Sequence, residues 1–180
     1  SNDGNVAPGS AAVVIDAGGT NFRTALLTFN ETGYSVEGLK KQPMPGIGKP
    51  CSWEEFVSFV ADNVEPFMDR ADVIGFCFSY SAVILPNMDG RVNRIDKEVV
   101  VTGSEGKLVG ESLSKELERR GYPGKRVVVL NDTVAVLLGG AASIDKPRYS
   151  GFIGQVSGTG TNTCATVRRS DIEKLGLEGE

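Results

Sequence analysis

The spacing of apolar residues in the first quarter of the chain predicts three consecutive strands. Residues 11–16 form an apolar run that ends in an acid, and residues 21–29 resume as a strand after a Gly-Gly pair. A turn at 30–33 leads into a third alternating run over 34–41. Because only short turns separate these runs, we expect them to pair as an antiparallel meander.

Helical spacing follows a loop rich in proline and glycine. Residues 52–69 carry one apolar stripe, and Ser52 with Glu55 has the spacing of a capping box. Residues 107–120 form a second amphipathic pattern with basic residues at its carboxyl end, and Gly121 stops it. Two helices are therefore predicted after the meander.

The remaining pattern alternates strands and a helix. The predicted elements are a buried strand over 73–79, an irregular or hairpin-like segment over 84–101, a strand over 127–130, a helix from Asp132 through Leu138, and a hairpin formed by 151–156 and 162–167. This order predicts an α/β fold with a five-stranded mixed sheet, helices packed on it, and the opening hairpin of a second lobe from about Tyr149.

Composition narrows the class of protein. The chain has 180 residues, of which 40% are hydrophobic and 23% charged, a balance typical of a soluble globular domain. The net charge of −4 gives no sign of nucleic-acid binding, and no apolar run approaches the ~18 residues of a membrane helix. The polar first ten residues lack a signal-peptide core, and we expect them to be disordered.

Cysteine and histidine usage bounds the chemistry. Cys51, Cys77 and Cys164 are scattered, so we expect buried free thiols in a reducing cytoplasm. Histidine is absent, and a general base must therefore be a carboxylate, lysine, tyrosine or thiol.

Residues 16–23 read Asp-Ala-Gly-Gly-Thr-Asn-Phe-Arg and carry the strongest local signal. The glycines allow backbone N–H groups to approach a phosphate where a Cβ would block them. Thr20 and Asn21 add neutral donors, Arg23 adds charge, and Asp16 could hold magnesium directly or through water. The alternative is a plain hairpin turn, but the acid before the glycines and the Thr-Asn-x-Arg after them favour a phosphate site.

Two further segments are ambiguous taken alone. Residues 157–162, Ser-Gly-Thr-Gly-Thr-Asn, could cradle other phosphate oxygens or be an ordinary loop, and they fit neither a Rossmann nor a Walker pattern. Asn131, Asp132 and Thr133 join an apolar strand to a helix, where Asp132 could be a helix cap worth ~1 kcal/mol. The strands before Asp16 and Asp132 both deliver an acid at their carboxyl ends, where ligands of open sheets collect.

Together these segments resemble the hexokinase family of the actin-like sugar-kinase superfamily. The similar segments are Val14–Arg23 (first phosphate motif), Gly75–Tyr80 (sugar-binding strand), Gly103–Gly106, Leu130–Val134 (catalytic aspartate) and Gly158–Asn162 (second phosphate turn). The resemblance implies an actin-like ATPase fold, related to ribonuclease H, and ATP-dependent phosphorylation of a hexose, with glucose first, at its 6-hydroxyl. It also implies ATP and magnesium as cofactors and a place in glycolysis.

The resemblance also implies a role for each matching residue. Asp132 would be the catalytic base that accepts the proton of the sugar 6-hydroxyl, and Asp16 would sit near magnesium, through water. The sugar would be bound by Ser79, Lys97, Asn131, Asp132 and Asn162. The nucleotide phosphates would be surrounded by Asp16, Gly18, Gly19, Thr20, Asn21, Arg23, Gly158, Thr159 and Gly160.

The chain departs from the family pattern at two places. The family's Ser-Phe-Pro is Ser79-Tyr80-Ser81 here, and Asp96 stands before Lys97 where a threonine is usual. The second departure leaves the hexose open, and mannose or fructose is the alternative acceptor. A non-catalytic sugar sensor built on the same fold is a separate alternative. We expect residues 1–10 to be disordered, 11–148 to form the small lobe and 149–180 to begin a truncated large lobe. Such a fragment is expected to be inactive alone and open to self-association.

Overall fold

The computed structural model describes residues 6–95, 98–143, 149, 151–158, 160–167 and 171. The chain divides into two compact units, Ser1–Asn131 and Asp132–Glu180. The division precedes residue 149, where we predicted the second lobe to begin, because the helix from Asp132 packs against the hairpin that follows it. The lobe boundaries themselves stay a prediction.

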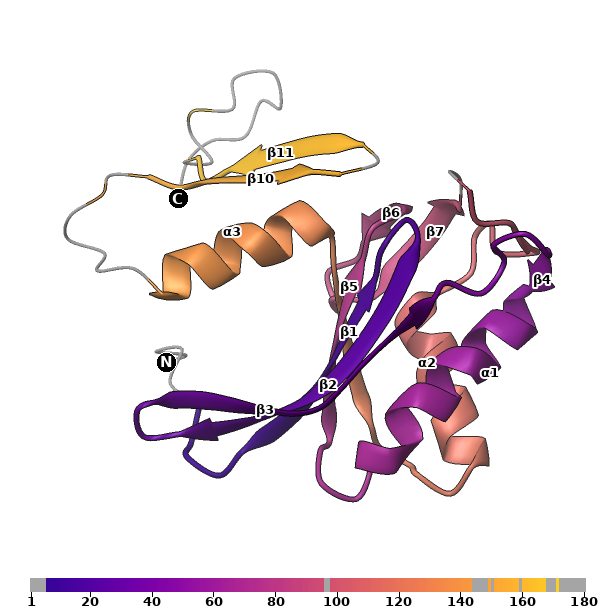
Figure 1. The fold of residues 1–180 in the computed structure, drawn as a ribbon, viewed down its shortest axis with the longest axis horizontal. Helices are drawn as coiled ribbons and strands as arrows, with labels where there is room; N and C mark the ends of the chain where they lie inside the picture. The colour runs from indigo at the N-terminus through magenta and orange to yellow at the C-terminus, as the bar shows by residue number, and fades with distance from the viewer. Residues whose placement is uncertain are drawn as a thin grey trace. The chain divides into compact units, whose positions relative to one another are not determined.

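A five-stranded mixed sheet forms the centre of the first unit (Figure 1). Its strand order is β3-β2-β1-β5-β9. The strands are β1 (Ala11–Ala17), β2 (Asn21–Asn30), β3 (Gly33–Pro43), β5 (Val73–Phe78) and β9 (Arg126–Leu130). The first three pair antiparallel, whereas β1, β5 and β9 run parallel to one another. The predicted meander and five-stranded mixed sheet are therefore confirmed.

Helix α1 (Trp53–Val64) begins where the sequence indicated. The Ser52 hydroxyl accepts from the Glu55 amide at 3.1 Å, and the Glu55 carboxylate accepts from the Ser52 amide at 2.7 Å, so the capping box is present. The α-helix ends earlier than the predicted Asp69. A short 3-10 turn, η1 (Glu65–Phe67), replaces its last part because Pro66 lacks the N–H that an α-helical bond requires.

Helix α2 (Val109–Arg119) is capped from a distant loop. The Asp89 side chain, 5% exposed, accepts from the Gly110 amide at 2.6 Å and from the Glu111 amide at 2.9 Å. The sequence pattern places the start of this helix two residues earlier, at residue 107, and gives no sign that Asp89 caps it. The amino end of α2 is therefore set by a tertiary contact.

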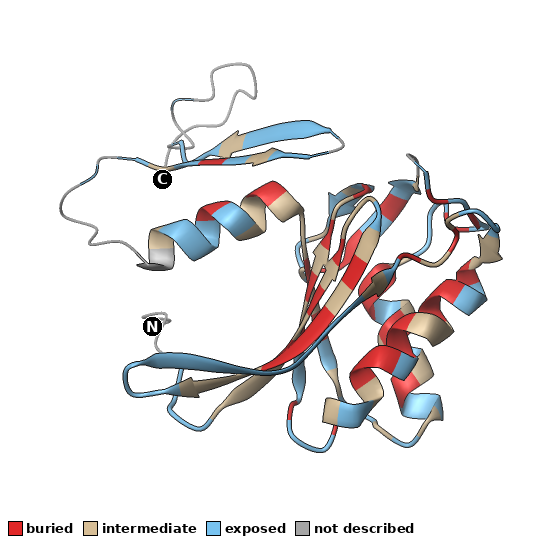
Figure 2. Ribbon diagram, in the orientation of Figure 1, coloured by how far each residue is buried: buried red, intermediate tan, exposed pale blue. Residues whose placement is uncertain are grey.

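Helices α1 and α2 cover one face of the sheet, and the core lies between these helices and the sheet (Figure 2). Phe22 from β2 meets Phe59 of α1 edge to face, with ring centroids 5.0 Å apart. Phe22 is fully buried and Phe59 partly buried; further fully buried side chains are Val13, Ile15, Phe56, Ile74, Leu113 and Leu117. Burial alternates along β1, so every second residue points away from this core.

Short strands complete the first unit. An antiparallel hairpin pairs β6 (Ser81–Ile84) with β7 (Gly90–Arg94). The segment predicted as irregular or hairpin-like over 84–101 therefore contains one strand of a hairpin. The parallel pair β4 (Cys51–Ser52) and β8 (Val101–Thr102) was not predicted, because two residues are too few to show a period.

The second unit contains α3 (Asp132–Ser143) and a hairpin of β10 (Ile153–Ser157) and β11 (Thr161–Ala165). The hairpin is confirmed, and the helix runs beyond the predicted Leu138, since Gly139 and Gly140 do not stop it. Gly154 allows the hairpin to approach α3: a Cβ there would lie 2.8 Å from the Thr133 carbonyl oxygen.

The cysteines correct one expectation. All three are free, but each is half-buried rather than buried. Burial, and then the Glu55 carboxylate, raise the pKa of the Cys51 thiol. Cys51 is therefore kept protonated at neutral pH and unreactive.

Candidate functional site: two glycine turns and a sheet edge

The predicted first phosphate turn links β1 to β2. Its backbone is held at both ends: the Gly18 amide donates to the Asn21 carbonyl at 3.0 Å, and the Thr20 carbonyl accepts from the Met44 amide at 3.0 Å. A Cβ at Gly18 would lie 3.2 Å from the Asn21 carbonyl oxygen, so glycine suits this tight turn. Among the described residues, none accepts a hydrogen bond from the Gly19 amide.

Asp16 and Arg23 form an ion pair across the two strands that flank this turn. The register of the β1–β2 pair places them directly opposite one another, and an Arg23 guanidinium nitrogen contacts an Asp16 carboxylate oxygen. Their side chains are 42% (Arg23) and 38% (Asp16) exposed. Both side chains are accessible to a ligand. When no ligand is bound, each balances the charge of the other.

The carboxyl ends of the three parallel strands gather further predicted residues at one sheet edge. Asp16 is in register with Cys77, and Cys77 with Leu130. Ser79 follows β5, and its amide donates to the Ala17 carbonyl at 3.2 Å. Asn131 follows β9 directly. The structure therefore brings the first phosphate turn, Ser79 and Asn131 to the same edge, the position where open α/β sheets bind ligands.

Asp132 is the first residue of α3, in the second unit. Its carboxylate accepts from the Thr133 amide at 2.7 Å, so it has a local capping contact as well as its predicted catalytic role. The next residue, Thr133, is buried, and its hydroxyl accepts from the Asn162 side-chain amide at 3.2 Å. The Cys164 thiol donates to the Thr133 carbonyl at 3.1 Å. These contacts fix predicted sugar residue Asn162 to the start of α3.

The predicted second phosphate turn joins β10 to β11. Ser157 pairs with Thr161, and the Gly158 amide donates to the Gly160 carbonyl at 2.9 Å. Three residues named from the sequence, Asp96, Lys97 and Thr159, lie outside the described residues.

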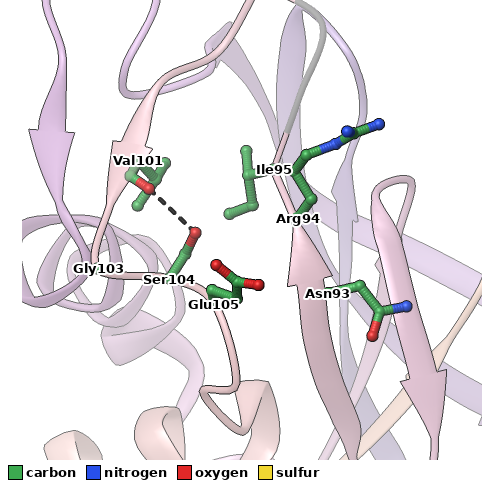
Figure 3. Close-up of a pocket in the computed structure, with 7 residues that line it drawn as sticks. All are labelled: Asn93, Arg94, Ile95, Val101, Gly103, Ser104 and Glu105. Atoms are coloured by element: carbon green, nitrogen blue, oxygen red, sulfur yellow. Dashed lines mark hydrogen bonds between the residues drawn. The ribbon is translucent and has the colours of Figure 1, made fainter.

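An open pocket of about 310 Å³ lies beside β7 in the first unit. It is lined by Asn93, Arg94, Ile95, Val101, Gly103, Ser104 and Glu105. Figure 3 shows Ile95 and the Glu105 carboxylate facing the hollow and the Arg94 guanidinium pointing away from it. The Ser104 hydroxyl donates to the Val101 carbonyl at 3.0 Å, so it serves the loop backbone. None of the predicted phosphate-binding residues lines this pocket.

Sequence reasoning missed one contact of the first phosphate turn. The Tyr80 hydroxyl donates to the Gly18 carbonyl oxygen at 2.8 Å. The available signal was the tyrosine itself, which places a hydroxyl after a buried strand where the family pattern has phenylalanine.

A magnesium site can be tested on the residues present. Within the described part of the chain, no three His, Cys, Asp or Glu side chains cluster as a metal site. Magnesium bound with a nucleotide needs only one or two protein carboxylates, because phosphate oxygens and water complete its shell. A single half-exposed Asp16 beside the phosphate turn fits that requirement.

Solved structures share this fold. A hexokinase from Schistosoma mansoni complexed with glucose matches 97% of this chain and 41% of its own, at 25% identity and a TM-score of 0.76. A second hexokinase crystal structure matches 92% of this chain and 41% of its own, at 21% identity and a TM-score of 0.70. The fold is the actin-like ATPase fold of sugar kinases.

The family model for hexokinase matches residues 9–142, and the chain belongs to the hexokinase family. Hexokinase-1 of Saccharomyces cerevisiae is 32% identical to it over 173 residues, which cover 91% of this chain and 35% of the yeast protein. The chain spans about a third of the length of the curated relatives it matches. The family predicted from the sequence motifs is thus confirmed.

Proposed function

We propose that the protein to which this chain belongs transfers the γ-phosphoryl group of ATP to the 6-hydroxyl of a hexose, with glucose as the first candidate. The observation that carries this proposal is the sheet edge. Neighbouring parallel strands end there in a glycine turn, in Ser79 and in Asn131, and Asp132 follows Asn131 in the chain. Phosphoryl transfer requires these parts: positioned phosphates, neutralising charge and a base for the attacking hydroxyl.

Each site residue has a proposed role in this reaction. Asp132 accepts the hydroxyl proton, and Ser79, Asn131, Asn162 and Lys97 hold the sugar. Amides of the two glycine turns, with the Thr20 and Thr159 hydroxyls and Arg23, hold the phosphates. Magnesium, when bound with ATP, supplies positive charge at the phosphates. Asp16 would hold it, with water completing the shell, and Arg23, which contacts Asp16 in the structure, would be close enough to contact a phosphate oxygen.

Charge and cysteine chemistry support further parts of the proposal. The net charge of −4 argues against a nucleic-acid partner. None of the helices in the described part of the chain is both long and apolar enough to cross a bilayer. Three free thiols suit a reducing cytoplasm. Leu138 and Ile153 are exposed apolar side chains of the second unit, and we propose that such side chains favour self-association of this chain.

The test is a coupled assay of ADP release by the full-length protein with Mg-ATP and separate hexoses. We expect turnover with glucose, and a higher kcat/KM for mannose or fructose would reassign the acceptor. Sugar binding without any ADP release would support the sugar-sensor alternative and overturn the kinase proposal. Lys97→Ala should raise the KM for the sugar more than the KM for ATP, since its ammonium serves a hydroxyl rather than a phosphate.

A further inference from the structure

Tyr80 connects the end of the predicted sugar-binding strand to the first phosphate turn. It is 4% exposed, and its ring packs against Phe78 with centroids 5.3 Å apart. Its hydroxyl donates to the Gly18 carbonyl oxygen at 2.8 Å. Because packing holds the ring, the position of the hydroxyl is fixed before any ligand binds.

Because of the geometry of the peptide bond, this contact also sets the direction of a hydrogen-bond donor, the Gly19 N–H. The Gly18 carbonyl and the Gly19 N–H belong to one planar trans peptide, in which the two groups point in opposite directions. A carbonyl held toward Tyr80 therefore directs the Gly19 N–H to the other side of the turn. Without this restraint a Gly-Gly peptide reorients easily, because neither residue has a Cβ to restrict it.

The other hydrogen bonds described for the turn involve neighbouring peptides and not the Gly18–Gly19 peptide. The bond from the Gly18 amide to Asn21 fixes the peptide before Gly18, and the bond from the Met44 amide to the Thr20 carbonyl fixes the peptide after Thr20. Of the hydrogen bonds described for this turn, the Tyr80 hydroxyl makes the one that sets the Gly18–Gly19 peptide itself.

We propose that Tyr80 is a positioning residue, which orients the Gly18–Gly19 peptide so that the Gly19 N–H faces a bound phosphate oxygen. This inference rests on the phosphate-binding role proposed for the turn. It assigns a purpose to a position at which the chain departs from the family's Ser-Phe-Pro. A phenylalanine would pack in the same place but could not hold the carbonyl.

The first experiment needs no ligand. Tyr80→Phe removes only the hydroxyl, and Tyr122→Phe is the matched control, since Tyr122 is half-buried against the core and its hydroxyl bonds to no described residue. In ¹⁵N NMR spectra of the 180-residue chain, we expect exchange broadening at the Gly19 amide in Tyr80→Phe alone. An unchanged Gly19 signal in Tyr80→Phe would overturn the proposal.

The second experiment measures phosphate affinity. Magnesium tripolyphosphate is titrated into the wild type and both variants, and thermal unfolding is recorded to detect a general loss of stability. We expect Tyr80→Phe to raise the Kd about 3- to 10-fold, the range for losing one neutral hydrogen bond, with Tyr122→Phe like the wild type.

The outcomes separate this inference from the proposed function. If the wild type binds tripolyphosphate and Tyr80→Phe binds it equally well, the positioning role is overturned while the phosphate turn stands. If the wild type itself does not bind tripolyphosphate, the turn does not bind phosphate. Both the phosphate-binding part of the proposed function and the positioning role of Tyr80 are then overturned.

Discussion

Asp89 shows how one buried carboxylate can define a helix end. Its two oxygens accept three backbone amides, those of Gly90, Gly110 and Glu111. We predict that Asp89→Ala lowers the free energy of unfolding by about 2 kcal/mol, since the amino end of α2 loses its cap and buried amides lose their acceptor. The change is measured by urea unfolding of the 180-residue chain.

The control for this prediction is Asp69→Ala, which removes an exposed carboxylate just after η1. Surface substitutions of this kind change stability by no more than about 0.5 kcal/mol. Equal unfolding free energies for the Asp89 and Asp69 variants would show that the cap is dispensable.

Asp132 combines a capping contact with the proposed role of general base, and one substitution separates the two. Asparagine caps helices as well as aspartate does, but it cannot accept a proton. We predict that Asp132→Asn in the full-length protein lowers kcat by about 10² or more and changes the KM for the sugar far less. Steady-state kinetics provide the measurement, and near-normal turnover would leave Asp132 as a cap only.

At the scale of elements, Arg120 joins the two helices that cover the sheet. Its guanidinium contacts Asp62 at 2.6 Å and Glu65 at 2.8 Å from the α1 segment, and Glu116 of α2 at 2.8 Å. The hydrogen bonds from Arg119, and further the one from Arg120, lower the pKa of Glu116 to about 2. The Arg120 cluster therefore stabilises the fold most when Glu116 is ionised.

This lowered pKa predicts a loss of stability in acid. Above the unfolded-state pKa of about 4.3 the stabilisation is fully present, and it disappears as the pH falls toward 2. We expect Glu116→Gln to be less stable than the wild type by about 1–2 kcal/mol at pH 7, with the difference narrowing at pH 3. Urea midpoints at both pH values measure it.

Glu118→Gln is the control on the same helix, because its side chain is exposed. It should follow the wild type at both pH values. A Glu116→Gln variant whose deficit stays constant from pH 7 to pH 3 would contradict the assigned cause.

Elements whose signals are local could be predicted from the sequence, and those set by distant contacts could not. The capping box of α1 lies within four consecutive residues, so its start was predicted correctly. The start of α2 depends on Asp89, and the end of α3 passes two glycines that alone would stop a helix. In the site, the order of the motifs was readable, whereas the Tyr80 contact required knowing that β5 lies beside β1.

At the scale of the molecule, we predict that the 180-residue chain folds but does not release ADP in a glucose-dependent manner. Phosphoryl transfer needs sugar and nucleotide enclosed and aligned, and orientation alone can contribute about 7–11 kcal/mol to lowering the barrier. The chain covers about a third of the length of its relatives. None of the motifs identified in its sequence is assigned to binding the adenosine of ATP. ADP release with glucose and Mg-ATP, compared with a chain-free blank, tests this prediction.

Turnover by the 180-residue chain near that of the full-length protein would show that these residues hold the whole catalytic apparatus. The Asp132→Asn variant of the same chain would then reveal whether the activity belongs to the proposed base or to a contaminating kinase.

The single tryptophan of the chain has a consequence for optical work on this protein. Trp53 is 3% exposed, stacks on Phe56 with ring centroids 5.3 Å apart, and donates its indole N–H to the Ser112 hydroxyl at 3.2 Å. Its fluorescence emission therefore reports on the packing of α1 against α2 and does not report unfolding that is confined to the second unit. A fluorescence melt would record the first unit alone, and far-ultraviolet circular dichroism is needed beside it to detect separate melting of α3.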